Sequence, residues 1–224
     1  MTLDKVSDAV PMLVLGLAKK VLLADNLGIA FQSISALSSG SLSGGSAWLG
    51  AIFYSLQLYF DFSGYSDMAI GMAKLFGFDF EANFDHPYLS GSLTEFWRRW
   101  HISLGRWFRD YVYIPLGGSR VSTVKCIRNL LIVWILTGLW HGASWTFAAW
   151  GLYHGILLLL EKYPLKGVLE KTPSPIRHIL TLLAVIIGWV LFFSPDFSSA
   201  LFYLGRMLGA GSRAFWDSTA KYYF

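Results

Sequence analysis

The stretch NLLIVWILTGLWHGASWTFAAWGLYHGILLLL, residues 129–160, contains no Asp, Glu, Lys or Arg over 32 positions. One continuous helix of this length would span about 48 Å, whereas the hydrocarbon core of a bilayer is about 30 Å thick. Glycine and small polar residues interrupt the apolar run at Trp140–Trp145. Basic residues flank both ends, which the positive-inside rule assigns to the cytoplasmic side. The stretch therefore predicts a membrane hairpin of two helices, with His141 near its deep turn.

Two further segments lack charged side chains, residues 26–60 and residues 178–195. Their apolar residues run continuously rather than alternating, so helices are expected in the membrane and a β-barrel is not. Only 14% of the residues are charged, against about 25% in an average soluble domain. The sequence predicts an all-α, polytopic integral membrane protein, with a short amphipathic helix at Phe197–Leu208.

Composition excludes several classes of protein. The single cysteine, Cys126, cannot build a disulfide framework or a thiol-ligated zinc site, and no metal site is expected. The net charge of +4 is too small to indicate a nucleic-acid partner. No nucleophile elbow, P-loop or dinucleotide fingerprint occurs, so no bound cofactor is expected.

A helix beginning at Thr94, with Thr94 as its N-cap, is expected to lie at the membrane surface. At 100° per residue its aromatic face carries Trp97, Trp100, His101, Leu104, Trp107 and Phe108. The opposite face carries four guanidinium groups, those of Arg98, Arg99, Arg106 and Arg109. Seven basic residues against one acid between Arg98 and Arg128 place this region on the cytoplasmic side.

Charged residues also occur beside the N-terminal apolar segments. A helix is expected over Val10–Ala24, which either lies at the membrane interface or extends Lys19 and Lys20 toward lipid head groups. A polar break is expected at Asp61–Asp67, between two helices. Its two aspartates have two interpretations: they bind a cation or a polar substrate, or they cap the following helix.

Histidines are the candidate catalytic residues. An ionisable group at membrane depth is a functional hypothesis by default, because its burial is costly. A neutral His141 would accept a proton from a hydroxyl, and the alternative is a bond to a backbone carbonyl of the broken helix. His101 is the second candidate, with an interfacial aromatic belt as its alternative. The weaker candidates are His86 in an exposed loop, His154 after the break, and His178 facing head groups.

Four long motifs resemble signatures of the membrane-bound O-acyltransferases, in the bacterial branch that includes alginate O-acetyltransferases. They are YFDFSGYSDMAIG at 59–71, FWRRWHISL at 96–104, WFRDYVYIPLGG at 107–118 and GLWHGASWTF at 138–147. The resemblance covers nearly the whole chain but only the C-terminal portion of the family's usual length. The family's N-terminal helices are missing, so the chain is expected to be one membrane domain, residues 1–224, that is inactive by itself.

The resemblance implies a ring of tilted helices around a tunnel from the cytoplasm to the outer side. His141 matches the family's catalytic histidine, and His101 matches a second position that is often asparagine elsewhere in the family. The guanidinium groups of Arg98, Arg99, Arg106 and Arg109 would meet a phosphate-bearing thioester donor, because arginine binds phosphate with two parallel hydrogen bonds.

The function expected from this resemblance is transfer of an acetyl group from acetyl-CoA, or another cytoplasmic thioester, toward hydroxyls of an exported, alginate-like polysaccharide. A bacterial inner-membrane location and a periplasmic acetyl-relay or polysaccharide-modifying partner are implied with it. Two alternatives stay open. One is a transporter with paired broken helices at Asp61–Asp67 and Trp140–Trp145, and the other is a non-catalytic scaffold of a polysaccharide-export complex.

Overall fold

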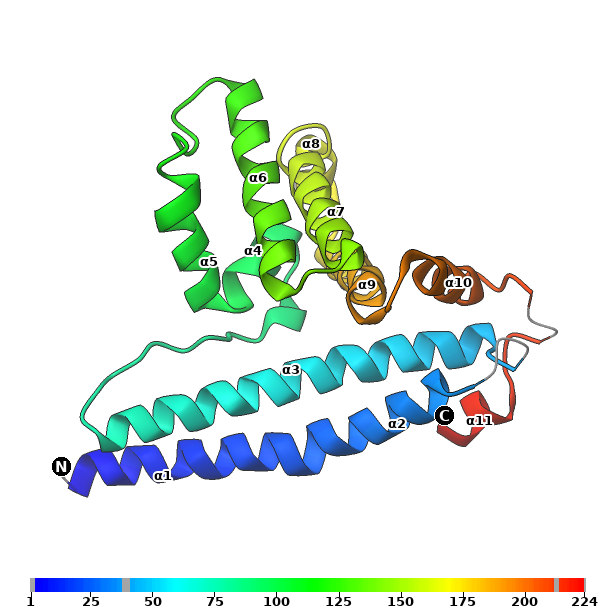
Figure 1. The fold of residues 1–224 in the computed structure, drawn as a ribbon, viewed down its shortest axis with the longest axis horizontal. Helices are drawn as coiled ribbons and strands as arrows, with labels where there is room; N and C mark the ends of the chain where they lie inside the picture. Colours follow the sequence, from blue (N-terminus) through cyan, green and yellow to red (C-terminus); the bar gives the residue numbers. More distant parts are fainter. Residues whose placement is uncertain (1–2, 38–40, 212–213, 224) are drawn as a thin grey trace. The chain divides into compact units, whose positions relative to one another are not determined.

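The computed structural model describes residues 3–37, 41–211 and 214–223. Within these ranges the chain forms helices and turns without a strand, as the sequence predicts. It divides into two compact units, Met1–Asn83 with Phe202–Phe224, and Phe84–Leu201 (Figure 1). The single membrane domain and the ring of helices around a tunnel stay predictions.

The first unit is built on two antiparallel helical rods, α1–α2 and α3 (Figure 1). Its helices are α1 (Leu3–Ala18), the π-helical segment η1 (Lys19–Ala24), α2 (Asp25–Ser35), α3 (Gly44–Leu75), the second half of α10 (Phe197–Met207) and α11 (Ser218–Tyr223). A Cβ on Gly16 would lie 2.6 Å from the carbonyl oxygen of Gly64. Such close contacts between small residues are typical of helix pairs in membranes.

The polar break expected at Asp61–Asp67 is wrong, because α3 runs through it without interruption. The two aspartates cap no helix. Asp67 pairs with Lys19 at 2.6 Å and Asp61 with Lys20 at 2.7 Å, so both lysines bind α3 instead of extending toward head groups. Asp61 raises the pKa of Lys20 through a hydrogen bond, with Asp25 adding to the effect. The transporter hypothesis thereby loses one of its two broken helices.

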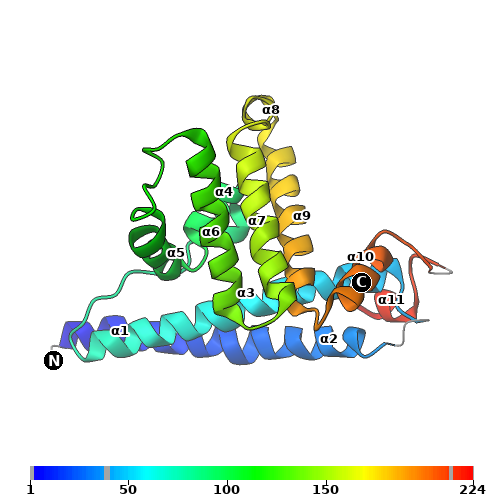
Figure 2. The same cartoon turned by 45° about the horizontal axis from the view of Figure 1, so that its top comes forward.

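The second unit contains the predicted hairpin, with α6 (Thr123–His141) and α7 (Trp145–Lys162) side by side and α9 (Ser174–Phe193) next to α7 (Figure 2). This confirms the break at Trp140–Trp145. The shorter elements are η2 (Pro87–Leu89), α4 (Leu93–Arg99), α5 (Ile102–Phe108), η3 (Arg109–Tyr113), α8 (Lys166–Lys171) and the first half of α10.

Glycines allow α6 and α7 to touch through their backbones. A Cβ on Gly151 would lie 2.2 Å from the carbonyl oxygen of Trp134, and one on Gly138 would lie 2.2 Å from that of Phe147. Both distances are far below van der Waals contact. The spacing of the hairpin therefore depends on the absence of side chains at these two positions.

In the part of the chain that the structure describes, two helices are long and apolar enough to cross a membrane. They are α6, with a mean hydropathy of 1.3, and α9, with 2.2. Only 28% of the most apolar window of each is buried within the chain, whereas a core helix of a soluble protein is mostly buried. Both helices therefore expose apolar surface that is suited to lipid.

The helix expected from Thr94 onward is in fact two helices, which is a correction. Trp100 adopts an extended backbone (φ −105°, ψ 126°) and His101 a left-handed one (φ 47°), so α4 ends at Arg99 and α5 starts at Ile102. Trp100 is buried and lies 5.1 Å from the Trp189 ring, whereas Trp107 is 49% exposed. The aromatic residues do not form one face, since the break sends them into different environments.

Candidate active site

His141 is the last residue of α6, at the turn of the hairpin. The chain turns there because Gly142 carries no side chain, and a Cβ at Gly142 would lie 2.8 Å from the ring of Phe147. Ser144 accepts a hydrogen bond from the backbone N–H of Thr146 at 3.3 Å and so caps α7. The turn thus fixes the position of His141 by backbone geometry.

The imidazole of His141 is half-buried among aromatic rings from three segments of the second unit. Ring centroids lie 5.0 Å away for Trp140 and Phe192 and 5.1 Å away for Trp150, and each of these rings meets the imidazole edge-on. Such a setting is largely apolar, so it favours a neutral imidazole. A neutral imidazole is suited to accept a proton.

His101 lies in the same neighbourhood. Its ring centroid is 6.0 Å from that of Trp140, the residue before His141. Burial, and to a lesser extent the charge of His141, lowers the pKa of His101 below its ordinary value. The fold therefore brings together two histidines that lie 40 positions apart in the sequence.

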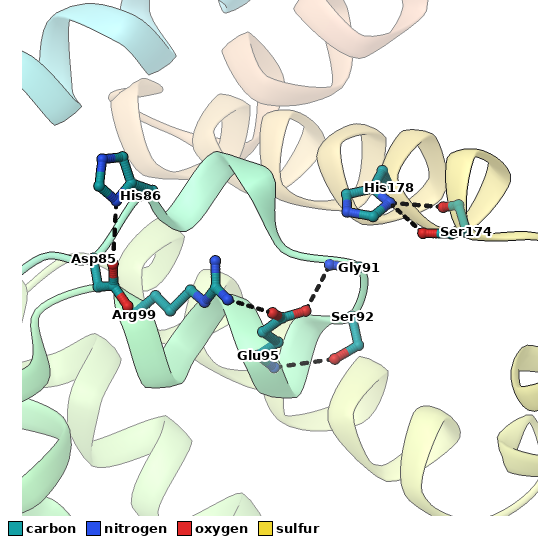
Figure 3. A network of polar contacts seen from close by, with 8 residues as sticks. All are labelled: Asp85, His86, Gly91, Ser92, Glu95, Arg99, Ser174 and His178. Atoms are coloured by element: carbon teal, nitrogen blue, oxygen red, sulfur yellow. Dashed lines mark hydrogen bonds and ion pairs between the residues drawn. The ribbon is translucent and has the colours of Figure 1, made fainter.

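The start of α4 is tied down by a network of polar contacts, drawn in Figure 3. Ser92 caps the helix by accepting a hydrogen bond from the N–H of Glu95 at 3.1 Å, so the predicted N-cap Thr94 is wrong. Glu95 in turn accepts from the N–H of Gly91 at 2.8 Å and pairs with Arg99 at 2.8 Å. These contacts orient the short helix that leads into His101.

Glu161, at the end of α7, holds the same helix start from the other side. Its carboxylate accepts hydrogen bonds from the backbone N–H of Leu93 at 2.7 Å and of Thr94 at 3.0 Å. We expect Glu161→Ala to lower the free energy of unfolding by about 1–2 kcal/mol, because two helix N–H groups lose a charged acceptor. Thermal unfolding in detergent measures the change. Glu170→Ala, at an exposed position, is the matched control and should leave the melting temperature unchanged.

The four predicted donor-binding arginines are spread over α4, α5 and η3, so they do not share one helix face. Arg99 pairs with Glu95, and Arg109 pairs with Asp110 at 2.7 Å, which holds the pKa of Asp110 below its usual range. Arg98 and Arg106 are exposed. Arg109 is exposed as well, whereas Arg99 is half-buried, so three of the four guanidinium groups lie on the surface of the described chain.

His154 is more closely integrated with the site than its sequence position indicates. It is fully buried, with its ring 4.8 Å from Trp97 and 5.2 Å from Trp150, the tryptophan that also touches His141. A Cβ on Gly188 would lie 2.5 Å from its Nε2 atom, so the glycine makes room for the ring. In the sequence, the glycines near His154 are the signal that could have indicated its burial.

The remaining histidines lie apart from this aromatic cluster. His86 is exposed as predicted and contacts Asp85 at 3.1 Å, while His178 donates from Nδ1 to the carbonyl oxygen of Ser174 at 2.7 Å (Figure 3). Among the described residues, no group of three or more His, Cys, Asp or Glu side chains is placed to hold a metal ion.

The sequence matches the family model of MBOAT, the membrane-bound O-acyltransferase family, over residues 9–204. It is 50% identical over 191 residues to "Probable alginate O-acetylase AlgI" of Azotobacter vinelandii, covering 85% of this chain and 38% of that protein. It is 50% identical over 209 residues to the protein of the same name from Pseudomonas syringae, covering 93% and 39%. It is 42% identical over 198 residues to "Peptidoglycan O-acetyltransferase" of Helicobacter pylori, covering 87% and 37%. The chain thus spans less than two fifths of the length of these relatives.

Proposed function

The chain belongs to the membrane-bound O-acyltransferase family, and on this premise we propose that it moves an acetyl group from a cytoplasmic thioester, acetyl-CoA, toward hydroxyls of an exported, alginate-like polysaccharide. Relatives named for O-acetylation of alginate and of peptidoglycan support a glycan acceptor. The observation that carries the proposal is that the rings of His141 and His101 both lie within 6.0 Å of the Trp140 ring, in a largely aromatic environment.

His141 is the general base in this proposal. Its neutral imidazole takes the proton of the accepting hydroxyl as the hydroxyl oxygen attacks the thioester carbonyl carbon. The carbon–sulfur bond then breaks, and the leaving thiolate takes the proton from His141 to become a free thiol. His101, whose lowered pKa keeps it neutral at pH 7, offers an N–H to the thioester carbonyl oxygen. The rings of Trp150 and Phe192 shield one side of His141 from water, which would otherwise hydrolyse the thioester.

The arginines Arg98, Arg99, Arg106 and Arg109 are proposed to bind the phosphates of the donor on the cytoplasmic side. We expect Arg98→Glu to raise the KM for acetyl-CoA roughly tenfold, which corresponds to about 1.4 kcal/mol, with kcat nearly unchanged. Arg98 is the best test position because its side chain is exposed.

Initial rates measured against donor concentration in membranes or detergent test this expectation. Lys171→Glu is the matched control, because it reverses an exposed charge at the end of α8. An unchanged dependence on donor concentration in the Arg98 variant would remove Arg98 from the donor site.

The proposed setting is the bacterial inner membrane, with several spans and a periplasmic relay or polysaccharide-modifying protein that receives the acetyl group. Mass spectrometry of the surface polysaccharide, with and without the intact gene, tests the function as a whole. We expect acetyl groups to be lost from the glycan when the gene is deleted and to return on complementation. A glycan whose acetylation does not depend on the gene would refute the proposal.

A further inference from the structure

A pocket of about 380 Å³ lies within the second unit, at the end of α7 that is remote from His141. Its walls are mainly apolar and come from α4, α7, α8 and α9, with Leu157, Leu160, Leu165, Leu169, Leu180 and Ala184 among them. At 1.5 Å per residue, Leu157 and Glu161 lie roughly 18–24 Å along α7 from Trp145, which follows the turn after His141. The pocket is therefore separate from the proposed catalytic site, and its volume is within the range of about 300–1,000 Å³ for small-molecule sites.

Four ionisable side chains line the pocket, those of Glu161, Lys166, Glu170 and Arg177. The carboxylate of Glu161 already accepts hydrogen bonds from the backbone N–H groups of Leu93 and Thr94. A helix N-terminus carries a partial positive charge, which offsets part of the charge of this carboxylate. The formal charges of the four side chains sum to zero, but because Glu161 is engaged by these N–H groups, Lys166 and Arg177 are the lining groups suited to an anion.

Arg177 has a polar atom that lacks a partner. Its Nε is buried, and the described part of the chain gives it no hydrogen-bond acceptor. A buried donor without an acceptor is costly, so such an atom indicates an oxygen ligand. Arg177 also stands in the first turn of α9, one of the two helices able to cross a membrane, and the end of such a helix lies at the depth of lipid head groups.

We propose that this pocket binds one anionic phospholipid, with its phosphate at Arg177 and Lys166 and part of an acyl chain among the leucines. The leucine walls match the apolar chain, and the basic side chains of Lys166 and Arg177 match the phosphate of an anionic lipid such as phosphatidylglycerol. The guanidinium supplies a charge-assisted hydrogen bond to a phosphate oxygen. The proposal is independent of acyl transfer, since it involves neither His141 nor His101.

Native mass spectrometry of the full-length protein in detergent, titrated with phosphatidylglycerol, tests the proposal. We expect the wild type to bind one phosphatidylglycerol at least tenfold more tightly than phosphatidylcholine, which has the same phosphate but no net charge. Arg177→Gln should weaken phosphatidylglycerol binding about tenfold, and Arg177→Lys should restore most of it. Arg120→Gln is the matched control, because it removes an exposed positive charge outside the pocket and should change nothing.

Other results would overturn the proposal. Equal affinity of the wild type and Arg177→Gln would mean that the lipid binds elsewhere on the apolar surface. Equal affinity for the two lipids would refute the preference for an anion, and full competition by inorganic phosphate would indicate a free anion as the ligand. If Arg177→Gln does not fold, Leu169→Asn on α8 replaces it, with weaker binding of phosphatidylglycerol expected and unchanged binding refuting the acyl-chain contact.

Discussion

Replacing His141 with alanine in the full-length protein should abolish O-acetylation of the polysaccharide while the protein remains in the membrane. Loss of a general base slows a reaction by about 10²–10⁴-fold. Acetyl groups per sugar, measured by mass spectrometry, report the activity, and an immunoblot of the membrane fraction reports the amount of protein. His141→Gln should behave in the same way, because it keeps a polar side chain but loses the basic nitrogen.

His86→Asn is the matched control for this experiment. His86 is exposed and has a left-handed backbone (φ 44°), which asparagine tolerates better than most residues. Acetylation should be unchanged in this variant. Retained acetylation in the His141→Ala strain would instead favour the scaffold hypothesis, in which the protein assembles a complex without doing chemistry.

Gly151→Val should prevent the second unit from folding stably. The added side chain would start 2.2 Å from the carbonyl oxygen of Trp134, and a helix backbone atom cannot rotate away as a side chain can. Overpacking of this kind typically costs 1–3 kcal/mol and sometimes more, and here α6 and α7 would have to separate along their contact. The yield of monodisperse protein and its thermal unfolding in detergent measure the effect.

Gly167→Val serves as the matched control. Gly167 also lies in a helix, α8, but a Cβ there has nothing within 4 Å. The same substitution should leave yield and melting temperature close to those of the wild type. Normal folding of the Gly151 variant would show that the two helices do not pack as closely as the structure has them.

The hairpin and α9 could be predicted from the sequence because charged side chains are rare in segments that cross an apolar solvent, and residues 129–160 and 178–195 lack them. The segment 129–160 is too long for one crossing, and its small polar residues occur near the middle. A helix end at Trp140–Trp145 follows from these two facts. Hydropathy therefore predicted the turn between α6 and α7, but not the start of α6, which lies at Thr123, before the apolar run begins.

The continuity of α3 could not be predicted in the same way. Asp61, Ser63, Gly64 and Asp67 have the composition of a loop, but each is used in a contact with a helix far away in the sequence or is buried against one. Gly64 allows close approach to Gly16, and the two aspartates neutralise Lys19 and Lys20. Only the contact with a second helix shows that such residues lie within a helix and not in a turn.

The candidate site was predicted in part. A resemblance to a family identified His141 and His101 as catalytic, and the structure brings both to Trp140, although their catalytic roles remain predictions. His154 was underrated because the break in the helix appeared to separate it from His141. Trp150 bridges the two rings across that break, which helical phase alone does not reveal.

The left-handed backbone at residue 101 determines which substitutions there can be interpreted. Histidine and asparagine are among the few residues with side chains that adopt this conformation readily. Asparagine at 101 would remove the imidazole and keep the chain path, whereas valine would add backbone strain of about 1–3 kcal/mol. Comparing the two variants separates the chemistry of this side chain from the bend that it allows between α4 and α5.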